Sequence, residues 1–256
     1  MSKFSGILVW DGTYISVRGY KTKIPLIWGI DYKTHDIPHF ILAPSENYVA
    51  CLNFFRMLKK LNYPLIILIC DGNEPVKQAV LDVYPNAIIQ TCLKHYIKNI
   101  RTDLNIASSD KYIDFYNFVY DAFFFKKCSK QHLAHEIARK YEDFKDDEKQ
   151  YDWMTSIMQN LEFLTNYHRV PNAPCTTNLI EGYNGHLKDR TKSIRGFKSF
   201  YSAYYWLNAY ILKRRFRVFT ACSKKFCKLN GYASIHLTAK NIEDLPNLFR
   251  ILPTKK

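Results

Sequence analysis

Apolar and polar residues alternate over much of the first forty positions of the chain. Three segments are rich in β-branched and aromatic residues and are separated by polar turns: GILVWDGTYISV (6–17), IPLIWGI (24–30) and IPHFILA (37–43). This pattern predicts three strands joined as a meander. Between 46 and 61 the apolar residues recur at helical spacing instead, so we expect a helix there.

A continuous apolar run, LIILIC (65–70), follows this helix. Such a run is typical of a strand buried on both faces, and the preceding helix favours parallel pairing with a neighbour. The pattern further predicts a helix over 74–83, a short fifth strand over 87–90 and a helix over 92–104. The predicted order is βββαβαβα, an α/β fold with a mixed sheet flanked by helices.

The pattern changes after residue 105, where long helical stretches follow one another to about 167 without a strand signal. Two prolines then interrupt the chain, and further helices are predicted from 178 and over 197–217. We therefore divide the chain into an α/β part at 1–105, a helical insertion at 106–170, a return of the α/β part at 171–218 and a basic C-terminal extension at 219–256. Five aromatic residues of the last helix are expected in the core: Phe200, Tyr201, Tyr204, Tyr205 and Trp206.

The 256 residues carry a formal net charge of +14, from 37 Lys and Arg against 23 Asp and Glu. Because this excess is spread along the chain, a polyanionic partner is expected, either nucleic acid or an anionic membrane surface. No apolar run approaches the ~20 residues of a membrane-spanning helix, and the first residues lack the apolar segment of a secretory signal. The seven scattered cysteines, an odd number, argue against a disulfide framework, so we expect an intracellular protein with reduced thiols.

Two aspartates occupy unusual positions relative to the predicted strands. Asp11 lies inside the first strand, where Asp is disfavoured, and Asp71 directly follows the buried fourth strand, before a glycine. A turn or helix-cap role would account for Asp71 alone. If the first and fourth strands are parallel neighbours, the two carboxylates lie side by side, and each needs a cation or a proton. Mg²⁺ is a hard divalent ion that prefers such oxygen ligands.

Glu181, within TTNLIEGYNGHLKDR (176–190), is the third acidic candidate. Asn178 followed by Glu181 is a capping-box pattern, so a role at the start of a helix is one interpretation. A third metal-binding carboxylate is the other, because Glu181, Asn184 and Lys188 share one stripe of the predicted helix and can face a common cleft. Basic residues continue this stripe as a track suited to a phosphate backbone, or as a solvated helix face: Lys188, Arg190, Lys192 and Arg195.

These acidic segments resemble the Mutator-like transposases and the related bacterial insertion-sequence enzymes, which have an RNase H-like DDE catalytic core. The segments in this chain are WDGTYI around Asp11, ICDGNEPVKQAVLDVYPNAIIQTCLKHYIKNI around Asp71, and TTNLIEGYNGHLKDRTKSIRGFKSF around Glu181. Each piece is short, but their order is specific. The resemblance extends from about residue 7 to residue 213 and so covers most of the chain.

The resemblance implies an RNase H-like fold in which a helical insertion precedes the last catalytic helix. It implies a DNA strand-transfer enzyme in which Asp11, Asp71 and Glu181 hold two Mg²⁺ ions, or Mn²⁺ in their place. Such enzymes cut double-stranded DNA at transposon ends and join the freed 3′-hydroxyl to target DNA, both by in-line phosphoryl displacement. A homo-oligomer on DNA is implied, in a bacterial cytoplasm and nucleoid or in a nucleus, with no membrane partner.

Cys92 and His95 form a Cys-x-x-His pair that also matches this family. We expect them to support the active-site loops or to contact DNA, and packing in the core is the alternative. A zinc site that joined this pair to His132 and His135 would need two distant pairs to converge, so zinc is not expected.

Relatives in this family carry an N-terminal DNA-binding region, whereas the first predicted strand begins here by about residue 7. End recognition is therefore expected to belong to the basic C-terminal region, to a partner or to a segment that has been lost. Two other interpretations stay open: a degenerate or domesticated relative that binds DNA without cutting it, and another RNase H-like nuclease. The intact Asp11, Asp71 and Glu181 count against the first, and the long helical insertion and the TTN-x-x-E segment are poor evidence for the second.

Overall fold

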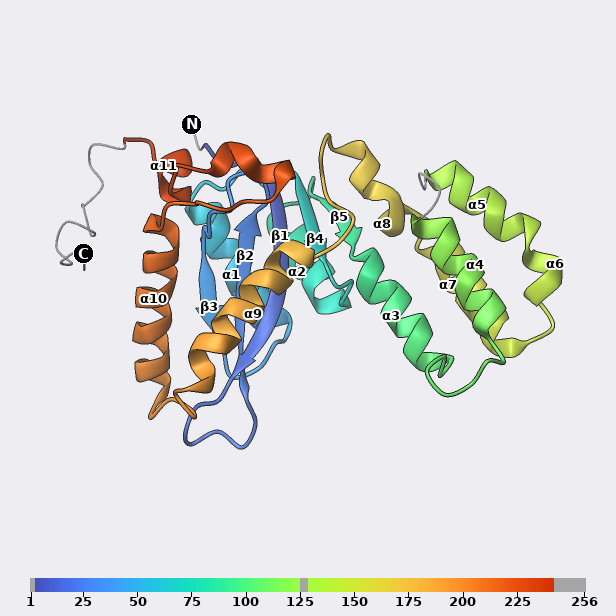
Figure 1. The fold of residues 1–256 in the computed structure, drawn as a ribbon, viewed down its shortest axis with the longest axis horizontal. Helices are drawn as coiled ribbons and strands as arrows, with labels where there is room; N and C mark the ends of the chain where they lie inside the picture. Colours follow the sequence, from blue (N-terminus) through green and yellow to red (C-terminus); the bar gives the residue numbers. More distant parts are fainter. Residues whose placement is uncertain (1–2, 125–128, 242–256) are drawn as a thin grey trace.

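A five-stranded mixed sheet forms the centre of the computed structural model, which describes residues 3–124 and 129–241 (Figure 1). The strand order is β3-β2-β1-β4-β5. β2 pairs antiparallel with β1 and β3, whereas β1, β4 and β5 run parallel, so the predicted meander and the parallel fourth strand are confirmed. The strands are β1 (Ile7–Ile15), β2 (Ile24–Asp31), β3 (Phe40–Leu42), β4 (Ile67–Cys70) and β5 (Ile88–Thr91).

Helices cover both faces of this sheet (Figure 1). They are α1 (Tyr48–Lys60) and α2 (Glu74–Val83) on one face, and α9 (Asn178–Lys192) and α10 (Phe200–Phe216) on the other. Leu8 and Trp10 of β1 pack toward α1 and α2, whereas Ile7 and Val9 pack toward α9 and α10. Because side chains alternate along a strand, Asp11 lies on the same face as Ile7 and Val9, toward α9.

A second group of helices has its own apolar core and extends from the β5 side of the sheet (Figure 1). Its members are α3 (Leu93–Asp103), α4 (Ile113–Phe124), α5 (Lys130–Arg139), α6 (Tyr141–Phe144), α7 (Glu148–Gln159) and α8 (Leu161–Thr165), followed by a 3₁₀ turn, η1 (Asn166–Arg169). The helical character predicted after residue 105 is confirmed, but the stretches are more broken than expected. At one break the Asn160 side chain donates to the Ser156 carbonyl at 2.8 Å, and thus competes with the helix backbone.

The segment after α10 folds back over one end of the sheet as a 3₁₀ turn, η2 (Lys224–Leu229), and a short helix, α11 (Ser234–Thr238) (Figure 1). Asp36, which is completely buried between β2 and β3, anchors it. The Arg215 guanidinium donates to both Asp36 oxygens at 2.7 and 2.8 Å, and the hydroxyls of Ser234 and Thr238 donate to the same carboxylate. The C-terminal segment is therefore part of the packed structure up to Ala239.

Two expectations are wrong. β3 is shorter than the predicted strand, because Pro38 has no N–H to contribute to a ladder. The aromatic residues of α10 are not all in the core, since Tyr201 is 71% and Tyr205 68% exposed. A stripe of Ala203, Leu207 and Ile211 at every fourth position faces the sheet instead. Across the described residues, every helix is too short or too polar to traverse a lipid bilayer.

Candidate active site

Asp11 and Asp71 lie on neighbouring parallel strands. β1 and β4 pair through Val9 and Ile69, and each aspartate follows two residues later in its own segment. The two side chains are close enough that the negative charge of Asp71 contributes to a raised pKa at Asp11. The register of one parallel strand pair thus brings together two acids that are distant in the sequence.

Burial raises the pKa of Asp11 to about 6, from an ordinary value of 3.8. This value is the net result: the charges of Asp71 and Glu46 add to the effect of burial, whereas His95 and a hydrogen bond from the Gly12 amide at 2.9 Å oppose it. The balance shows that the negative form of Asp11 lacks sufficient positive charge nearby. A divalent cation is one way to supply that charge.

Asn184 connects Asp11 to α9. Its side-chain amide group donates to Asp11 Oδ2 at 2.8 Å, while its carbonyl oxygen accepts the Trp28 indole N–H at 2.9 Å. An indole N–H can only donate, so Trp28 fixes which end of the Asn184 amide faces Asp11. Both Asn184 and Trp28 are buried, and this chain of hydrogen bonds joins β2, α9 and β1.

Glu181 lies one turn before Asn184 on α9, so the two side chains emerge on the same flank of the helix. Its carboxylate accepts hydrogen bonds from the Lys94 ammonium at 2.7 Å and from the Thr177 hydroxyl at 3.1 Å. Burial would raise the pKa of Glu181, but the hydrogen bond and charge of Lys94, with Thr177 and His95, outweigh it and lower the pKa. Glu181 therefore differs from Asp11, because it has a cation beside it.

The capping-box interpretation of Asn178 and Glu181 is wrong. α9 begins at Asn178, its N-cap residue is Thr177, and no side chain caps its first turn. Asn178 instead accepts a hydrogen bond from Lys94 at 3.2 Å. Glu181 thus makes no capping contact that would explain its position.

Cys92, His95 and Glu181 form a compact cluster beside these acids. Their sulfur, nitrogen and oxygen atoms lie within 4.8 Å of one another. Burial opposes ionisation of the Cys92 thiol, but hydrogen bonds from His95 and Thr177 outweigh it and lower its pKa. The hydrogen bond with Cys92 is the largest of the causes that raise the pKa of His95. The pair is therefore polar and connected to Glu181, rather than merely packed in the core.

Sulfur and imidazole ligands are typical of zinc and other transition metals, whereas Mg²⁺ prefers oxygen. Among the described residues, the structure places Glu181 beside Cys92 and His95, and not His132 or His135. The latter two lie at and near the start of α5, within the helical group. The site thus has an oxygen-rich part around Asp11 and a mixed part around His95.

Residues 2–214 match the family model described as "Transposase, Mutator family". The chain belongs to this family. It is similar to the transposase for insertion sequence element IS1201 of Lactobacillus helveticus, with 21% identity over 71% of this chain and 50% of the relative. It is also similar to the transposase for insertion sequence element IS905 of Lactococcus lactis subsp. lactis (strain IL1403), with 23% identity over 73% of this chain and 48% of the relative. The chain spans about half the length of these two curated relatives.

A fourth carboxylate, which the sequence pattern does not indicate, lies near Asp11 in this Mutator-family chain. Glu46, just before α1, accepts a hydrogen bond from the Tyr14 hydroxyl at 3.1 Å and contributes to the raised pKa of Asp11. Burial raises the pKa of Glu46; the Tyr14 hydrogen bond opposes this, and Asp71 adds to it. Gly12 leaves room for it, because a Cβ atom there would overlap the Glu46 carboxylate. Nothing in its local sequence distinguishes Glu46 from an ordinary helix-start residue.

The sequence pattern does not indicate Lys94 or Thr177 as site residues either, although both lie inside the segments around Asp71 and Glu181 that resemble the family. Lys94 is the residue before His95, and Thr177 precedes the helix of Glu181. A polar side chain adjacent to a candidate ligand was the available signal, but the spacing alone could not show that both contact Glu181.

The predicted basic track is not gathered around the acids. Lys188, Arg190, Lys192 and Arg195 are exposed on α9 and the turn that follows it. Lys192 pairs with Asp189 at 2.9 Å, and Arg190 lines a cavity between α9 and α10. All four follow Glu181 along the sequence of α9 and the turn after it, and they stay predicted DNA contacts.

Proposed function

We propose that this Mutator-family chain is the catalytic part of a DNA transposase. It cuts DNA at transposon ends and joins the freed 3′-hydroxyl to target DNA, both in Mg²⁺-dependent reactions. Asp11, Asp71 and Glu181 are the proposed catalytic residues and the ligands of two Mg²⁺ ions, which Mn²⁺ could replace. The observation that supports this most strongly is the hydrogen bond from Asn184 to Asp11, because it ties the helix of Glu181 to the strand pair of the two aspartates.

The carboxylates fit a hard divalent ion, since Asp11, Asp71 and Glu46 place several oxygens around one region and Asp11 has a pKa raised to about 6. Two bound ions would activate a water or 3′-hydroxyl nucleophile and stabilise the leaving oxygen. The residues of the chain orient the ligands: Trp28 and Asn184 hold the carboxylate of Asp11.

Lys94 has a separate role in this proposal. It neutralises Glu181 at 2.7 Å before an ion is bound, and with 56% of its side chain exposed it can also reach a DNA phosphate. The Thr177 hydroxyl contacts Cys92, His95 and Glu181, so Cys92 and His95 support Glu181 through this threonine. We propose that these residues position Glu181 and that the ions themselves are held by carboxylate oxygens rather than by the Cys92 sulfur.

The strand order and directions support an RNase H-like core within the α/β fold. We propose that this core comprises 1–105 and 171–218, with 106–170 as a helical insertion and 219–256 as a C-terminal extension. Joining two transposon ends to one target requires two active sites, so we propose that the chain works as a homo-oligomer on DNA.

A cleavage assay tests the function. The substrate is a duplex that carries the terminal sequence flanking the gene, incubated with the protein in Mg²⁺ or in EDTA. We expect nicking and strand transfer in Mg²⁺ alone, and loss of both in Asp11→Asn, Asp71→Asn and Glu181→Gln, with DNA affinity retained. Glu74→Gln is the matched control, because Glu74 is an exposed acid at the start of α2, three residues after Asp71.

The outcome separates the other interpretations. Wild-type cleavage by one of the three acid variants would remove that residue from the site. DNA binding without any metal-dependent cleavage would indicate a relative that no longer cuts. Nicking without transfer of the 3′-hydroxyl to target DNA would indicate a nuclease rather than a transposase.

A further inference from the structure

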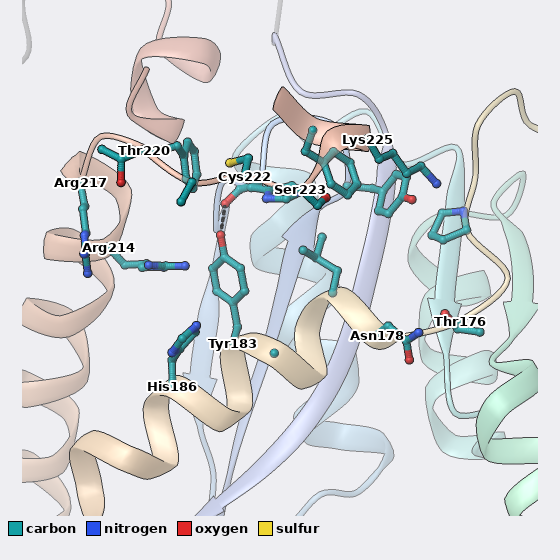
Figure 2. Close-up of a pocket in the computed structure, with 18 of the residues that line it drawn as sticks. Thr176, Asn178, Tyr183, His186, Arg214, Arg217, Thr220, Cys222, Ser223 and Lys225 are labelled. Atoms are coloured by element: carbon teal, nitrogen blue, oxygen red, sulfur yellow. Dashed lines mark hydrogen bonds between the residues drawn. The ribbon is translucent and has the colours of Figure 1, made fainter. Parts of the chain in front are cut away.

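A large cavity lies on the flank of α9 opposite to Glu181 and Asn184. It has a volume of about 860 Å³ and is open to solvent, and it is lined by α9 and the segment before it, the end of α10, the segment after β2 and the segment that leads into η2. Figure 2 shows Tyr183 and His186 rising into it from α9, Arg214 and Arg217 on one side, and Lys225 on the other. The cavity is within the size range of ligand sites in proteins, which is about 300–1,000 Å³.

The lining of this cavity is cationic. Arg214, Arg217 and Lys225 supply the positive charge, and no Asp or Glu is among the described residues that line it. Burial and the charge of Arg214 lower the pKa of His35, another lining residue, to about 4, so its ring is neutral near pH 7. Asp36, a buried acid outside this lining, is already neutralised by Arg215. An anionic ligand would therefore meet positive charge without an opposing carboxylate.

Aromatic rings stand beside these cations. The Arg214 guanidinium lies 4.5 Å from the centre of the Tyr183 ring, and the Lys225 ammonium lies 5.2 Å from that of Tyr32 and 5.8 Å from that of Phe226. Proteins that bind unpaired nucleotides combine such features, because rings stack on a base while cations contact its phosphate. The lining thus fits a nucleotide better than a small inorganic anion.

One buried polar atom in the lining lacks a partner. His35 is only 8% exposed, and its Nε2 atom makes no hydrogen bond within the described structure. Its ring packs against Phe226, with ring centres 4.3 Å apart. Buried nitrogen atoms in folded proteins are almost always hydrogen-bonded, so this atom lacks a partner that a water molecule, or a ligand reached by a small shift of the ring, would supply.

The basic character continues into a second, smaller cavity of about 370 Å³ between α9 and α10. His186, Arg214 and Arg217 line both cavities, and Arg190 and Lys213 line the smaller one. Trp206 and Tyr210, two more residues of this cavity, stack with ring centres 5.4 Å apart. The two cavities therefore form one basic and aromatic path along the far flank of α9.

We propose that the larger cavity binds one unpaired nucleotide of DNA, with its phosphate at Lys225 and its base against the aromatic rings beside that lysine. The base must be unpaired because the rings can reach its face only when it leaves the duplex stack. The identification of the ligand as DNA rests on the proposed function. The binding itself requires neither the metal nor cleavage, so it is measured separately.

The first experiment measures binding of a fluorescent single strand of six thymidines in EDTA. We expect Lys225→Ala to weaken binding about tenfold and to reduce the salt slope by about 0.7, as expected when one phosphate contact to a single strand is lost. Lys224→Ala is the matched control, because Lys224 is the adjacent exposed lysine and does not line the cavity. Equal effects of the two variants would overturn the proposal.

The second experiment follows the labelling rates of two free cysteines by mass spectrometry. Cys222 lines the cavity, whereas Cys227 is exposed outside it. We expect the single strand to slow labelling of Cys222 at least threefold and to leave Cys227 unchanged. Equal protection of both cysteines would overturn the proposal, as would equal protection of Cys222 by a duplex or by inorganic phosphate. In this labelling assay Asp71→Asn, which is expected to lose cleavage, should show the same protection of Cys222 as the wild type. Loss of protection is therefore distinct from failure of the catalytic proposal.

Discussion

Without Mg²⁺, the replacement of Asp11 by Asn is expected to stabilise the folded protein at pH 8. Burial is the largest cause that raises the pKa of Asp11, from 3.8 to about 6. A carboxyl group with a raised pKa binds its proton more tightly in the folded than in the unfolded state. The free energy of unfolding therefore falls as the pH rises from about 4 to about 6, and the whole loss is present at higher pH.

The size of this loss follows from the shift. About two pKa units correspond to about 3 kcal/mol at pH 8, since one unit is about 1.4 kcal/mol. At pH 5, where folded Asp11 is still mostly protonated, the loss is only about 1.5 kcal/mol. Asn carries no charge, so Asp11→Asn removes the loss at both pH values.

Hydrogen bonding opposes part of this gain. The two oxygens of Asp11 accept from Asn184 and from the Gly12 amide, whereas an Asn side chain has only one oxygen. Asn184 cannot turn its own oxygen toward the new amide, because Trp28 holds it. One hydrogen bond is thus lost, at a cost of about 1 kcal/mol that does not depend on pH. The net stabilisation is about 2 kcal/mol at pH 8 and about 0.5 kcal/mol at pH 5.

Urea unfolding in EDTA at the two pH values, followed by circular dichroism, measures this difference. Asp152→Asn is the matched control, because it makes the same charge change at an exposed position of α7. Its effect on stability should be small and similar at both pH values. The reasoning is refuted if Asp11→Asn is no more stable than the wild type at pH 8, or if its stabilisation is the same at pH 5.

Three further predictions concern the contacts around this site and the C-terminal segment. Asn184→Leu leaves a buried indole N–H without an acceptor and is expected to destabilise the protein by about 1–3 kcal/mol in urea unfolding. Arg215→Met leaves the buried Asp36 without its ion pair and is expected to cost about 3–5 kcal/mol in the same assay. Lys94→Met removes the ammonium that competes for Glu181, so Mg²⁺ should stabilise this variant against heat at a lower concentration than the wild type.

Each of these variants has a control that makes a comparable change at an exposed position. Asn208→Leu and Lys213→Met, both on α10, serve for the two stability measurements, and Lys98→Met on α3 serves for the Mg²⁺ titration. A control that loses as much stability as its partner would contradict the assigned contact. For Lys94→Met, an Mg²⁺ dependence equal to that of Lys98→Met would show that the ammonium does not compete.

The order of the elements could be predicted because each has a local signal. The apolar run of β4 and the helix before it predict a parallel central strand, and the alternation in β1 predicts the side of the sheet that Asp11 faces. These signals also suggest that Asp11 and Asp71 lie close together, since strand register relates the ends of paired strands. The helical stripe in α9 predicts that Glu181 and Asn184 share a flank.

Contacts between distant segments could not be predicted in this way. Lys94 and Glu181 are 87 residues apart, and neither helix pattern specifies how α3 and α9 approach each other. Glu46 reaches the site only because Gly12 on β1 leaves space for it. The sequence predicts the tyrosines of α10 in the core, because their aromatic character does not show which side of the helix faces the sheet. Tyr201 and Tyr205 lie on the side that the sheet leaves uncovered.

The two parts of the candidate site differ in their charge before any ion is bound. Asp11 is buried, with a raised pKa, and Asp71 and Glu46 add negative charge to it, so this part gains most from a cation. Glu181 has a lowered pKa because Lys94 already supplies that charge. An ion that binds at the aspartates therefore displaces no side-chain cation, whereas an ion that binds at Glu181 must displace the Lys94 ammonium. On the proposed function, a DNA phosphate that draws Lys94 away would free Glu181 for the second ion, which makes ion binding depend on substrate. The Lys94 variant tests this directly, because it should bind Mg²⁺ with less dependence on DNA than the wild type.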